Sequence, residues 1–360
     1  MANITKTVKT DCRFFRGGIP CLYHKKFGVK CEDCKYYDKV AERILIIKLK
    51  AAGDIIRTTP ILRKIKEKFP HSEISWLTCF PKLVPSLVDN ILDFNLQNIL
   101  WLFAQKFDFL FNLDKDKEAC SLAELIKAKV KKGFELKDGK CAPIDKNAFS
   151  KWKTGIWDDI NKKNKKSYPQ EIFELCGFDF SGEKYILEIE KHTKWPVFIH
   201  PLIGLNTGYG EQWKVREYPK ARWVELVRKL RKAGYGVLIL GGRKEHKKNK
   251  EIARKSGGRY IGYFPLEQFT DLVNQTDLVI TCVTMTLHIA IALKKKVLLF
   301  NNAFNRNEFE LYGLGKIIEP SVPCLACYKS SCNLRFKGKK CMELINVDKV
   351  LGKCKKILTL

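Results

Sequence analysis

The first place in this 360-residue sequence where residue types and spacing suggest chemistry is the loop Lys50-Ala51-Ala52-Gly53-Asp54. It lies between an apolar run and a segment with helical spacing. Gly53 therefore permits a tight turn, and Asp54 falls at a helix start with its carboxylate near an expected cleft. The alternative is that Asp54 only caps this helix. Because the loop lacks the three spaced glycines of a dinucleotide-binding fingerprint, a nicotinamide cofactor is disfavoured.

Cysteines form a second pattern. Eight of the fourteen fall in two terminal groups, each containing a Cys-x-x-Cys pair that lets two thiolates reach one tetrahedral ion: Cys12, Cys21, Cys31 and Cys34, and Cys324, Cys327, Cys332 and Cys341. Disulfides are disfavoured, since a cytosolic chain keeps its thiols reduced. We predict two structural zinc sites of four thiolates each. An iron–sulfur cluster and unliganded thiols are the alternatives.

The charge of the chain is strongly positive. There are 67 lysines and arginines against 39 acids, a net charge of +28. Such a charge attracts a polyanion: nucleic acid, an anionic membrane surface or a phosphorylated substrate. A solvated basic face is the alternative. No apolar run approaches the roughly 18 residues that span a bilayer, and no secretory signal is readable, so we expect a cytoplasmic protein.

The elements that would position these residues alternate between strand and helix in the first half of the chain. This alternation predicts a parallel sheet. The periodicity predicts strands at Arg43–Leu49, His71–Cys79 and Phe107–Leu113, and helices at Ile55–Phe69, Pro85–Asn90 and Glu118–Val130. An elaborated loop is expected at 145–169, before a helix at Gln170–Cys176.

The alternation restarts in the second half. Strands are predicted at Val197–Leu205, Gly236–Leu240, Leu278–Cys282 and Lys296–Phe300, and helices at Ala221–Ala233, Lys244–Ser256 and Thr286–Leu293. We therefore predict an α/β fold of two Rossmann-like lobes facing a cleft, with ligands at the carboxyl ends of the strands. The predicted divisions are a cysteine-rich extension at 1–42, lobes at 43–190 and 191–320, and a cysteine-rich segment with a helix at 321–360.

The segment RILIIKLKAAGDIIRTTPILRKIKEKFPHSEISWLT resembles the opening of glycosyltransferase family 9, the heptosyltransferases: an apolar strand, Gly-Asp, Thr-Pro, a helix and a second strand. Three later stretches are also similar to the family: Gly204–Trp223, Gly241-Gly242 with Glu245, and the helix start Thr286–Ala290. The resemblance spans roughly residues 43 to 345. It implies a GT-B-like fold and an inverting sugar transfer that needs no catalytic metal.

The resemblance also implies roles for particular residues. Asp54 would be the general base that takes the proton of the acceptor hydroxyl, with Lys50, Gly53 and Arg57 on the acceptor side. The donor would be a nucleotide sugar similar to ADP-heptose, and the acceptor an acidic glycolipid or glycan of the lipopolysaccharide core. The residues implied in donor binding are Thr207, Lys214, Arg216, Glu245, Thr284, Thr286 and His288. Arg216 falls where the family has a phosphate-binding lysine, and Lys214 is its alternative.

Two departures separate this chain from the family pattern. Where the family has D-[ST]-G-x-x-H, the chain has Val283-Thr284-Met285-Thr286-Leu287-His288, and Phe300-Asn301-Asn302-Ala303 replaces F-G-P-T. An acid and a glycine are thus absent from the expected phosphate loop. A degenerate member that binds a glycan or partner without catalysis is one alternative. A nucleic-acid-binding protein is another, although no basic stacking surface of aromatic residues is evident and we predict no nucleic-acid partner.

The charge and the implied substrate lead to a further prediction. An enzyme that acts on an acidic glycolipid at the cytoplasmic leaflet benefits from a basic surface beside its acceptor cleft. We therefore predict peripheral contact with the anionic inner leaflet. The candidate cations are Lys50, Arg57, Arg63 and Lys64, with the lysines of Lys151–Lys166.

Overall fold

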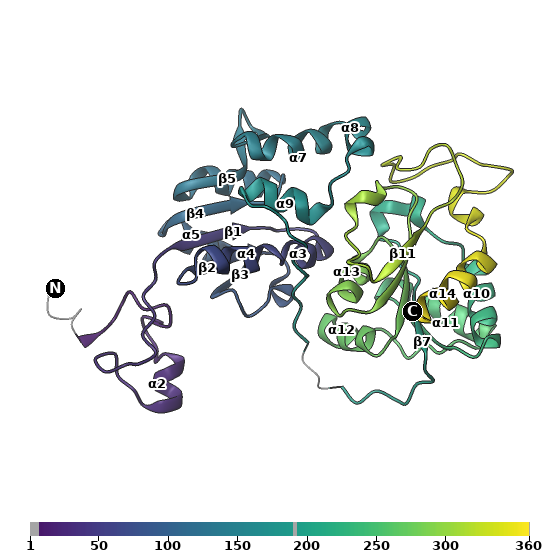
Figure 1. The fold of residues 1–360 in the computed structure, drawn as a ribbon, viewed down its shortest axis with the longest axis horizontal. Coiled ribbons are helices and arrows are strands. Elements are labelled where there is room, and N and C mark those ends of the chain that lie inside the picture. Colours follow the sequence, from purple (N-terminus) through teal and green to yellow (C-terminus); the bar gives the residue numbers. More distant parts are fainter. Residues whose placement is uncertain (1–6, 190–192, 360) are drawn as a thin grey trace. The chain divides into compact units, whose positions relative to one another are not determined.

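The computed structural model describes residues 7–189 and 193–359, and its contacts divide the chain into two compact units. Unit 1 comprises the residues up to Lys50, with Pro60–Phe149 and Ile172–Asp179. Unit 2 comprises Ala51–Thr59, Ser150–Glu171 and the residues from Phe180 onward. Each unit contains a sheet with helices packed on it (Figure 1), which confirms the predicted α/β class. The boundary predicted between residues 190 and 191 lies outside the described residues.

Unit 1 is built on a six-stranded sheet in the order β3-β2-β1-β4-β5-β6. Only β6 runs antiparallel to its neighbour. The strands are β1 Arg43–Ile47, β2 Glu73–Thr78, β3 Asn90–Asp93, β4 Lys106–Asn112, β5 Lys127–Lys137 and β6 Lys140–Pro143. Strand β1 is apolar and buried from Ile44 to Ile47, so both of its faces are covered, as expected for a central parallel strand.

The helices of the first half of the chain are short. They are α2 Leu22–Phe27, α3 Ala52–Thr58, α4 Ile61–Lys68, α5 Leu96–Phe103, α6 Lys117–Leu125, α7 Lys146–Ile156, α8 Asp158–Lys163 and α9 Tyr168–Cys176, with a 3₁₀ turn η1 at Pro81–Leu83. Leu102 of α5 and Ala119, Leu122 and Ala123 of α6 share one buried core with strands β1, β2 and β4. Helices α5 and α6 therefore cover the same part of the unit 1 sheet.

Four sequence predictions in this half need correction. The helix expected at 55–69 is two helices, because the chain is interrupted at Thr59 and Pro60. The helix expected at 85–90 is absent: Asp89 instead accepts the N–H of Ile74 at 2.9 Å, and the chain enters β3. The helix expected at 118–130 stops at Leu125, because the following lysine-rich segment pairs with β4 as β5. The expected loop at 145–169 contains α7 and α8.

Unit 2 contains a five-stranded parallel sheet in the order β11-β10-β9-β7-β8. Its strands are β7 Leu202–Asn206, β8 Gly236–Leu240, β9 Leu278–Cys282, β10 Lys296–Phe300 and β11 Gly315–Ile318. Its later helices are α10 Lys220–Lys232, α11 His246–Ser256, α12 Leu266–Asn274, α13 Met285–Ala292 and α14 Val347–Leu358, with 3₁₀ turns η2 Glu211–Arg216, η3 Arg243–Glu245, η4 Arg306–Glu308 and η5 Cys341–Leu344.

The apolar core of unit 2 joins its helices to its sheet. Helices α10, α11 and α14 bury their apolar faces with the strands in one cluster around Trp223 and Phe300. The predicted C-terminal helix is thus part of the core, with Val350 and Cys354 fully buried. Among the described residues, no helix combines the length and apolar character needed to cross a bilayer.

Candidate functional site

A pocket of about 760 Å³ lies in unit 2, at the carboxyl ends of strands β7, β8, β9 and β10. All its lining residues belong to unit 2. They come from the start of α3, from η2, from α12 and from the segments that follow the four strands. Ligands of open parallel sheets bind at this edge. Of the residues predicted from the sequence, the pocket contains Gly53, Asp54, Arg57, Arg216, Glu245, Thr284, Thr286 and His288.

Asp54 lies in the first turn of α3 and is not its cap, so the capping alternative is wrong: the N-cap is Ala51, and no side chain caps the helix. The Oδ1 atom of Asp54 accepts from Arg57 Nε at 3.0 Å and lies 2.9 Å from its Nη2. The Arg57 guanidinium also lies 3.5 Å from the centre of the Tyr168 ring. Burial opposes the charge of Arg57, but Asp54 and other anionic groups raise its pKa above the usual range. The pair therefore holds the Asp54 carboxylate in one orientation.

Gly53 allows helix α3 to approach α13 closely. A Cβ atom at this position would lie 2.7 Å from Cδ2 of His288 and 3.5 Å from Cα of Met285. His288 is 4% exposed, and its Nδ1 atom is buried without a hydrogen-bond partner. Burial, together with the charge of Arg57, lowers the pKa of His288 to about 3. This imidazole is therefore neutral at physiological pH and lines the pocket as a polar, uncharged ring.

Arg216 is a buried cation without an anionic partner among the described residues. Its side chain is 6% exposed, and its Nη1 donates to the carbonyl oxygen of Val283. Its Nε is buried and makes no hydrogen bond, and no carboxylate of the described residues forms an ion pair with it. Desolvation lowers the pKa of Arg216 to about 10, so it remains protonated at physiological pH. Such a cation is expected to be compensated by a bound anion.

The segment after β9, which departs from the family pattern, still provides polar groups. Asn206 Nδ2 donates to the hydroxyl oxygens of Thr281 and Thr284, both at 3.0 Å. Val283 contributes its carbonyl oxygen to Arg216, a role that does not depend on its side chain. After β8, Glu245 accepts the N–H of Gly242 at 2.9 Å, which fixes the position of its carboxylate.

Three predicted site residues do not line this pocket. Thr207 is buried, its hydroxyl donates to Asn249 Oδ1 at 2.5 Å, and its N–H is bonded to Leu240. Lys214 is exposed and lines a different cavity. Lys50, in unit 1, is exposed at its side chain, while its N–H donates to Asp114 at 3.2 Å.

Among the pocket residues that the sequence did not single out are an aromatic pair and a glutamate. Trp213 and Phe304 form an aromatic pair with ring centres 4.6 Å apart, and each lies within about 5.5 Å of the Arg216 guanidinium. Glu308, in η4, lines the pocket and accepts from the Tyr328 hydroxyl. Trp213 could have been identified from the sequence, because it is an aromatic residue close to the predicted Arg216. Phe304 and Glu308 lie in a segment for which the sequence offered none.

Each predicted set of four cysteines lines one cavity. Cys12, Cys21, Cys31 and Cys34 surround a cavity of about 30 Å³ in unit 1, and Cys324, Cys327, Cys332 and Cys341 line one of about 200 Å³ in unit 2. All eight are free thiols. Across residues 7–189 and 193–359, no three His, Cys, Asp or Glu side chains are arranged to hold a metal ion. The structure gathers the thiols of each set but does not turn them toward one centre, so the zinc sites stay a prediction.

A comparison with known protein families gives a match in the second half of the chain. Residues 186–333 match the model of "Glycosyltransferase family 9 (heptosyltransferase)", which confirms the resemblance predicted from the sequence. The matched segment contains the pocket residues from Asn206 to Phe309 but not Asp54. No curated protein matches the sequence.

Solved structures match both units. The glycosyltransferase family 9 protein from Veillonella parvula is 18% identical, with a TM-score of 0.67 over 89% of this chain and 98% of that one. The heptosyltransferase WaaC of E. coli with ADP-2-deoxy-2-fluoro heptose is 13% identical, with a TM-score of 0.61 over 87% and 99%. The iron-containing dodecameric glycosyltransferase TibC of enterotoxigenic E. coli is 13% identical, with a TM-score of 0.54 over 89% and 77%. These similarities establish a GT-B-like fold.

Proposed function

Because the chain carries a glycosyltransferase family 9 segment, at residues 186–333, we propose that the protein transfers a heptose or similar sugar from a nucleoside diphosphate to an acidic glycan or glycolipid. The observation that supports this most directly is Arg216, a buried guanidinium that lines the pocket of unit 2 and has no carboxylate partner in the part of the chain that the structure describes. A diphosphate provides the charge and the hydrogen-bond acceptors that this side chain lacks.

In the proposed reaction, an acceptor hydroxyl oxygen attacks the anomeric carbon of the donor from the face opposite the diphosphate. The new C–O bond forms, the bond to the diphosphate oxygen breaks, and the configuration is inverted. Asp54 takes the hydroxyl proton as general base. Arg216 stabilises the negative charge that develops on the leaving diphosphate. No step requires a metal ion.

The remaining pocket residues suggest how the donor is held. Glu245, fixed by the N–H of Gly242, would accept from ribose hydroxyls, and the start of α13 at Thr284 and Thr286 would face the phosphates. The structure of WaaC with ADP-2-deoxy-2-fluoro heptose supports an ADP-linked heptose as the first donor to test. His288, being neutral, can donate or accept a hydrogen bond without adding charge.

Replacement of Arg216 tests this proposal. Arg216→Ala should weaken ADP binding in calorimetry by about 1.5 to 3 kcal/mol, roughly tenfold to a hundredfold. Lys214→Ala is the matched control, because it removes a neighbouring cation that does not line the pocket. Equal affinity for ADP in wild type and Arg216→Ala would mean that the diphosphate binds elsewhere. A larger loss in Lys214→Ala would transfer the role to that residue.

A non-catalytic member that only binds a glycan or partner is the second candidate, and one contact favours it. Asp54 is hydrogen-bonded to Arg57, and an adjacent cation makes a carboxylate a weaker base. In that case the protein would bind nucleotide sugars without releasing nucleoside diphosphate in the presence of any acceptor. Turnover measurements separate the two candidates.

We also propose that the two cysteine sets hold one structural metal ion each, zinc in the first instance. Several thiols already accept N–H groups, as metal-bound thiolates do: Cys21 from His24 and Cys332 from Leu334, both at 3.4 Å, and Cys341 from Asn302 at 3.2 Å. TibC is an iron-containing glycosyltransferase of similar fold, and this makes iron the alternative. A cytoplasmic location, with contact at an anionic membrane surface, completes the proposal.

A further inference from the structure

Helix α5 presents apolar side chains on both of its faces. Ile99 and Leu102 point into the core of unit 1. Leu96, Leu100 and Phe103 follow the i, i+4, i+7 spacing of the opposite face and are 67%, 58% and 41% exposed. Trp101, beside this stripe, is 39% exposed, and the helix sequence LQNILWLF contains no charged residue. An exposed apolar helix face of this kind marks an interaction surface.

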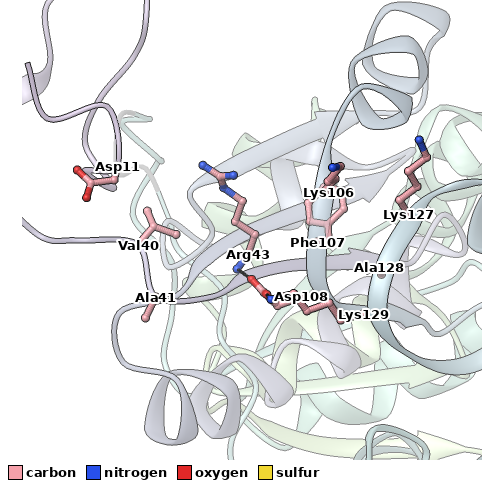
Figure 2. A pocket seen from close by; sticks show the side chains of 10 residues that line it. All are labelled: Asp11, Val40, Ala41, Arg43, Lys106, Phe107, Asp108, Lys127, Ala128 and Lys129. Atoms are coloured by element: carbon pink, nitrogen blue, oxygen red, sulfur yellow. Dashed lines mark hydrogen bonds and ion pairs between the residues drawn. The ribbon is translucent and has the colours of Figure 1, made fainter. Parts of the chain in front are cut away.

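A basic pocket of about 460 Å³ lies at the amino ends of strands β1, β4 and β5, at the opposite ends of the strands from the loop before Gly53. Figure 2 shows the guanidinium of Arg43 and the ammonium groups of Lys106 and Lys127 extending in the same direction. Asp108 is already neutralised, because it accepts the N–H of Arg43 at 2.8 Å and pairs with Lys129 at 2.7 Å.

Two of the three exposed lysines of this pocket have no counter-charge among the described residues, whereas the third, Lys129, pairs with Asp108. Lys106 and Lys127 are exposed, and neither forms an ion pair with another described residue. They face each other directly across the β4–β5 pairing. Two neighbouring ammonium groups without a carboxylate repel each other, and an anionic ligand would relieve that repulsion.

The apolar and the basic residues adjoin along the chain and in the sheet. Phe103 ends α5 three residues before Lys106, the first residue of β4. Leu125 ends α6 two residues before Lys127, the first residue of β5, and is 64% exposed. Because α5 leads into β4, α6 leads into β5, and β4 pairs with β5, the ends of both helices lie at the amino-end edge of these two strands. We call the set Leu96, Leu100, Trp101, Phe103, Leu125, Arg43, Lys106 and Lys127 the docking face.

We propose that the docking face binds the surface of a bilayer rich in anionic phospholipids, an inference that rests on the proposed function for its substrate at the membrane. Leucine and phenylalanine side chains enter the acyl boundary, and Trp101 lies at the headgroup level. Lys106 and Lys127 contact lipid phosphates, together with Arg43, whose Nε also lies 3.4 Å from the Glu73 carboxylate. This surface differs from the one expected from the sequence. Arg57, one of the cations expected to contact the membrane, instead packs against Tyr168 and pairs with Asp54.

Charge distinguishes a bilayer from the other occupants of such a face. A symmetric contact with a second copy of this chain would bury Lys106 and Lys127 of both copies in one interface, and the docking face contains no carboxylate to pair with them. A nucleic acid would neutralise the lysines but leave the leucine stripe in water, because bases stack on aromatic rings and not on aliphatic side chains. An anionic bilayer satisfies both parts of the docking face.

The test uses the full chain and cosedimentation with vesicles of mixed phosphatidylglycerol and phosphatidylcholine, or of phosphatidylcholine alone. Wild type should bind the anionic vesicles and dissociate as salt rises past physiological levels, where the screening length is about 8 Å. Lys106→Glu/Lys127→Glu should bind at least tenfold more weakly. Its matched control is Lys247→Glu/Lys250→Glu, which makes the same charge change at two exposed lysines of α11 in unit 2 and should change binding less than twofold.

A second pair of measurements tests insertion. Leu96→Ser/Leu100→Ser should weaken binding to anionic vesicles at least fivefold, and brominated lipids should quench a fluorescence component that Trp101→Phe removes. The proposal is overturned if both charge variants lose binding equally, if the leucine variant binds like wild type, or if it instead abolishes a dimer seen by light scattering. Calorimetry with ADP on the same variants separates the proposals: retained ADP affinity with lost vesicle binding concerns the docking face, and the reverse concerns the pocket.

Discussion

Asp54→Asn offers the sharpest test of the proposed chemistry, because it removes the proton acceptor while changing little else. The asparagine keeps an oxygen where Oδ1 now accepts from Arg57 at 3.0 Å. Asp54 is 30% and Arg57 13% exposed at the side chain, so the pair is only partly solvated, and losing its negative charge should cost roughly 1 to 3 kcal/mol of stability. Loss of a general base should lower turnover by about 10² to 10⁴, or roughly 3 to 5 kcal/mol in activation free energy.

The assay is release of ADP from ADP-heptose in the presence of a lipopolysaccharide core acceptor, with ADP affinity measured in parallel by calorimetry. Affinity should stay within about threefold of wild type, since Asp54 contributes no positive charge to the diphosphate. Asp89→Asn in unit 1 is the control: it weakens a comparable ion pair, with Arg13 at 2.6 Å, and should lower the melting temperature without changing turnover of the folded protein. Turnover of Asp54→Asn above half of the wild-type value would refute the assignment of the base.

Two further predictions concern the metal sites and pH. Protein purified under reducing, chelator-free conditions should contain two metal ions by elemental analysis; Cys31→Ser and Cys327→Ser should each remove one, Cys79→Ser none, and a metal-free wild type would favour free thiols. His288, whose pKa is lowered to about 3 in the folded chain, takes up a proton near pH 6.5 when unfolded. The unfolded state therefore binds more protons between these values, and the free energy of unfolding should fall as pH drops from about 6.5 toward 3, by up to roughly 4 kcal/mol. Urea denaturation of His288→Asn should show a flatter pH dependence over that range; an unchanged slope would assign the effect to other groups.

The local sequence pattern was sufficient to predict the strands that are buried on both faces of a sheet. Strands β8, β9 and β10 occur at the residues predicted for them, because each is a short apolar run between polar or glycine-containing segments. The prediction of secondary structure was less accurate where pairing with a neighbouring strand determines the conformation of a segment. Residues 127–137 alternate lysine with small and apolar residues, and they form a strand because β4 is available on one side and β6 on the other. Periodicity within one segment carries no information about its partner.

The candidate site shows the same division. The residues that carry the resemblance to the family, among them Asp54, Glu245 and His288, were identified by their positions in short motifs. Only the tertiary structure decided that Arg57 pairs with Asp54 and that Arg216 is buried with no carboxylate from residues 7–189 or 193–359 beside it. It also decided that Trp213 and Phe304 flank Arg216. It also decided that Thr207 and Lys214 lie outside the pocket. Burial and charge pairing depend on residues far apart in the chain, so sequence determined which groups are present, and folding determined which of them remain uncompensated and able to bind a ligand.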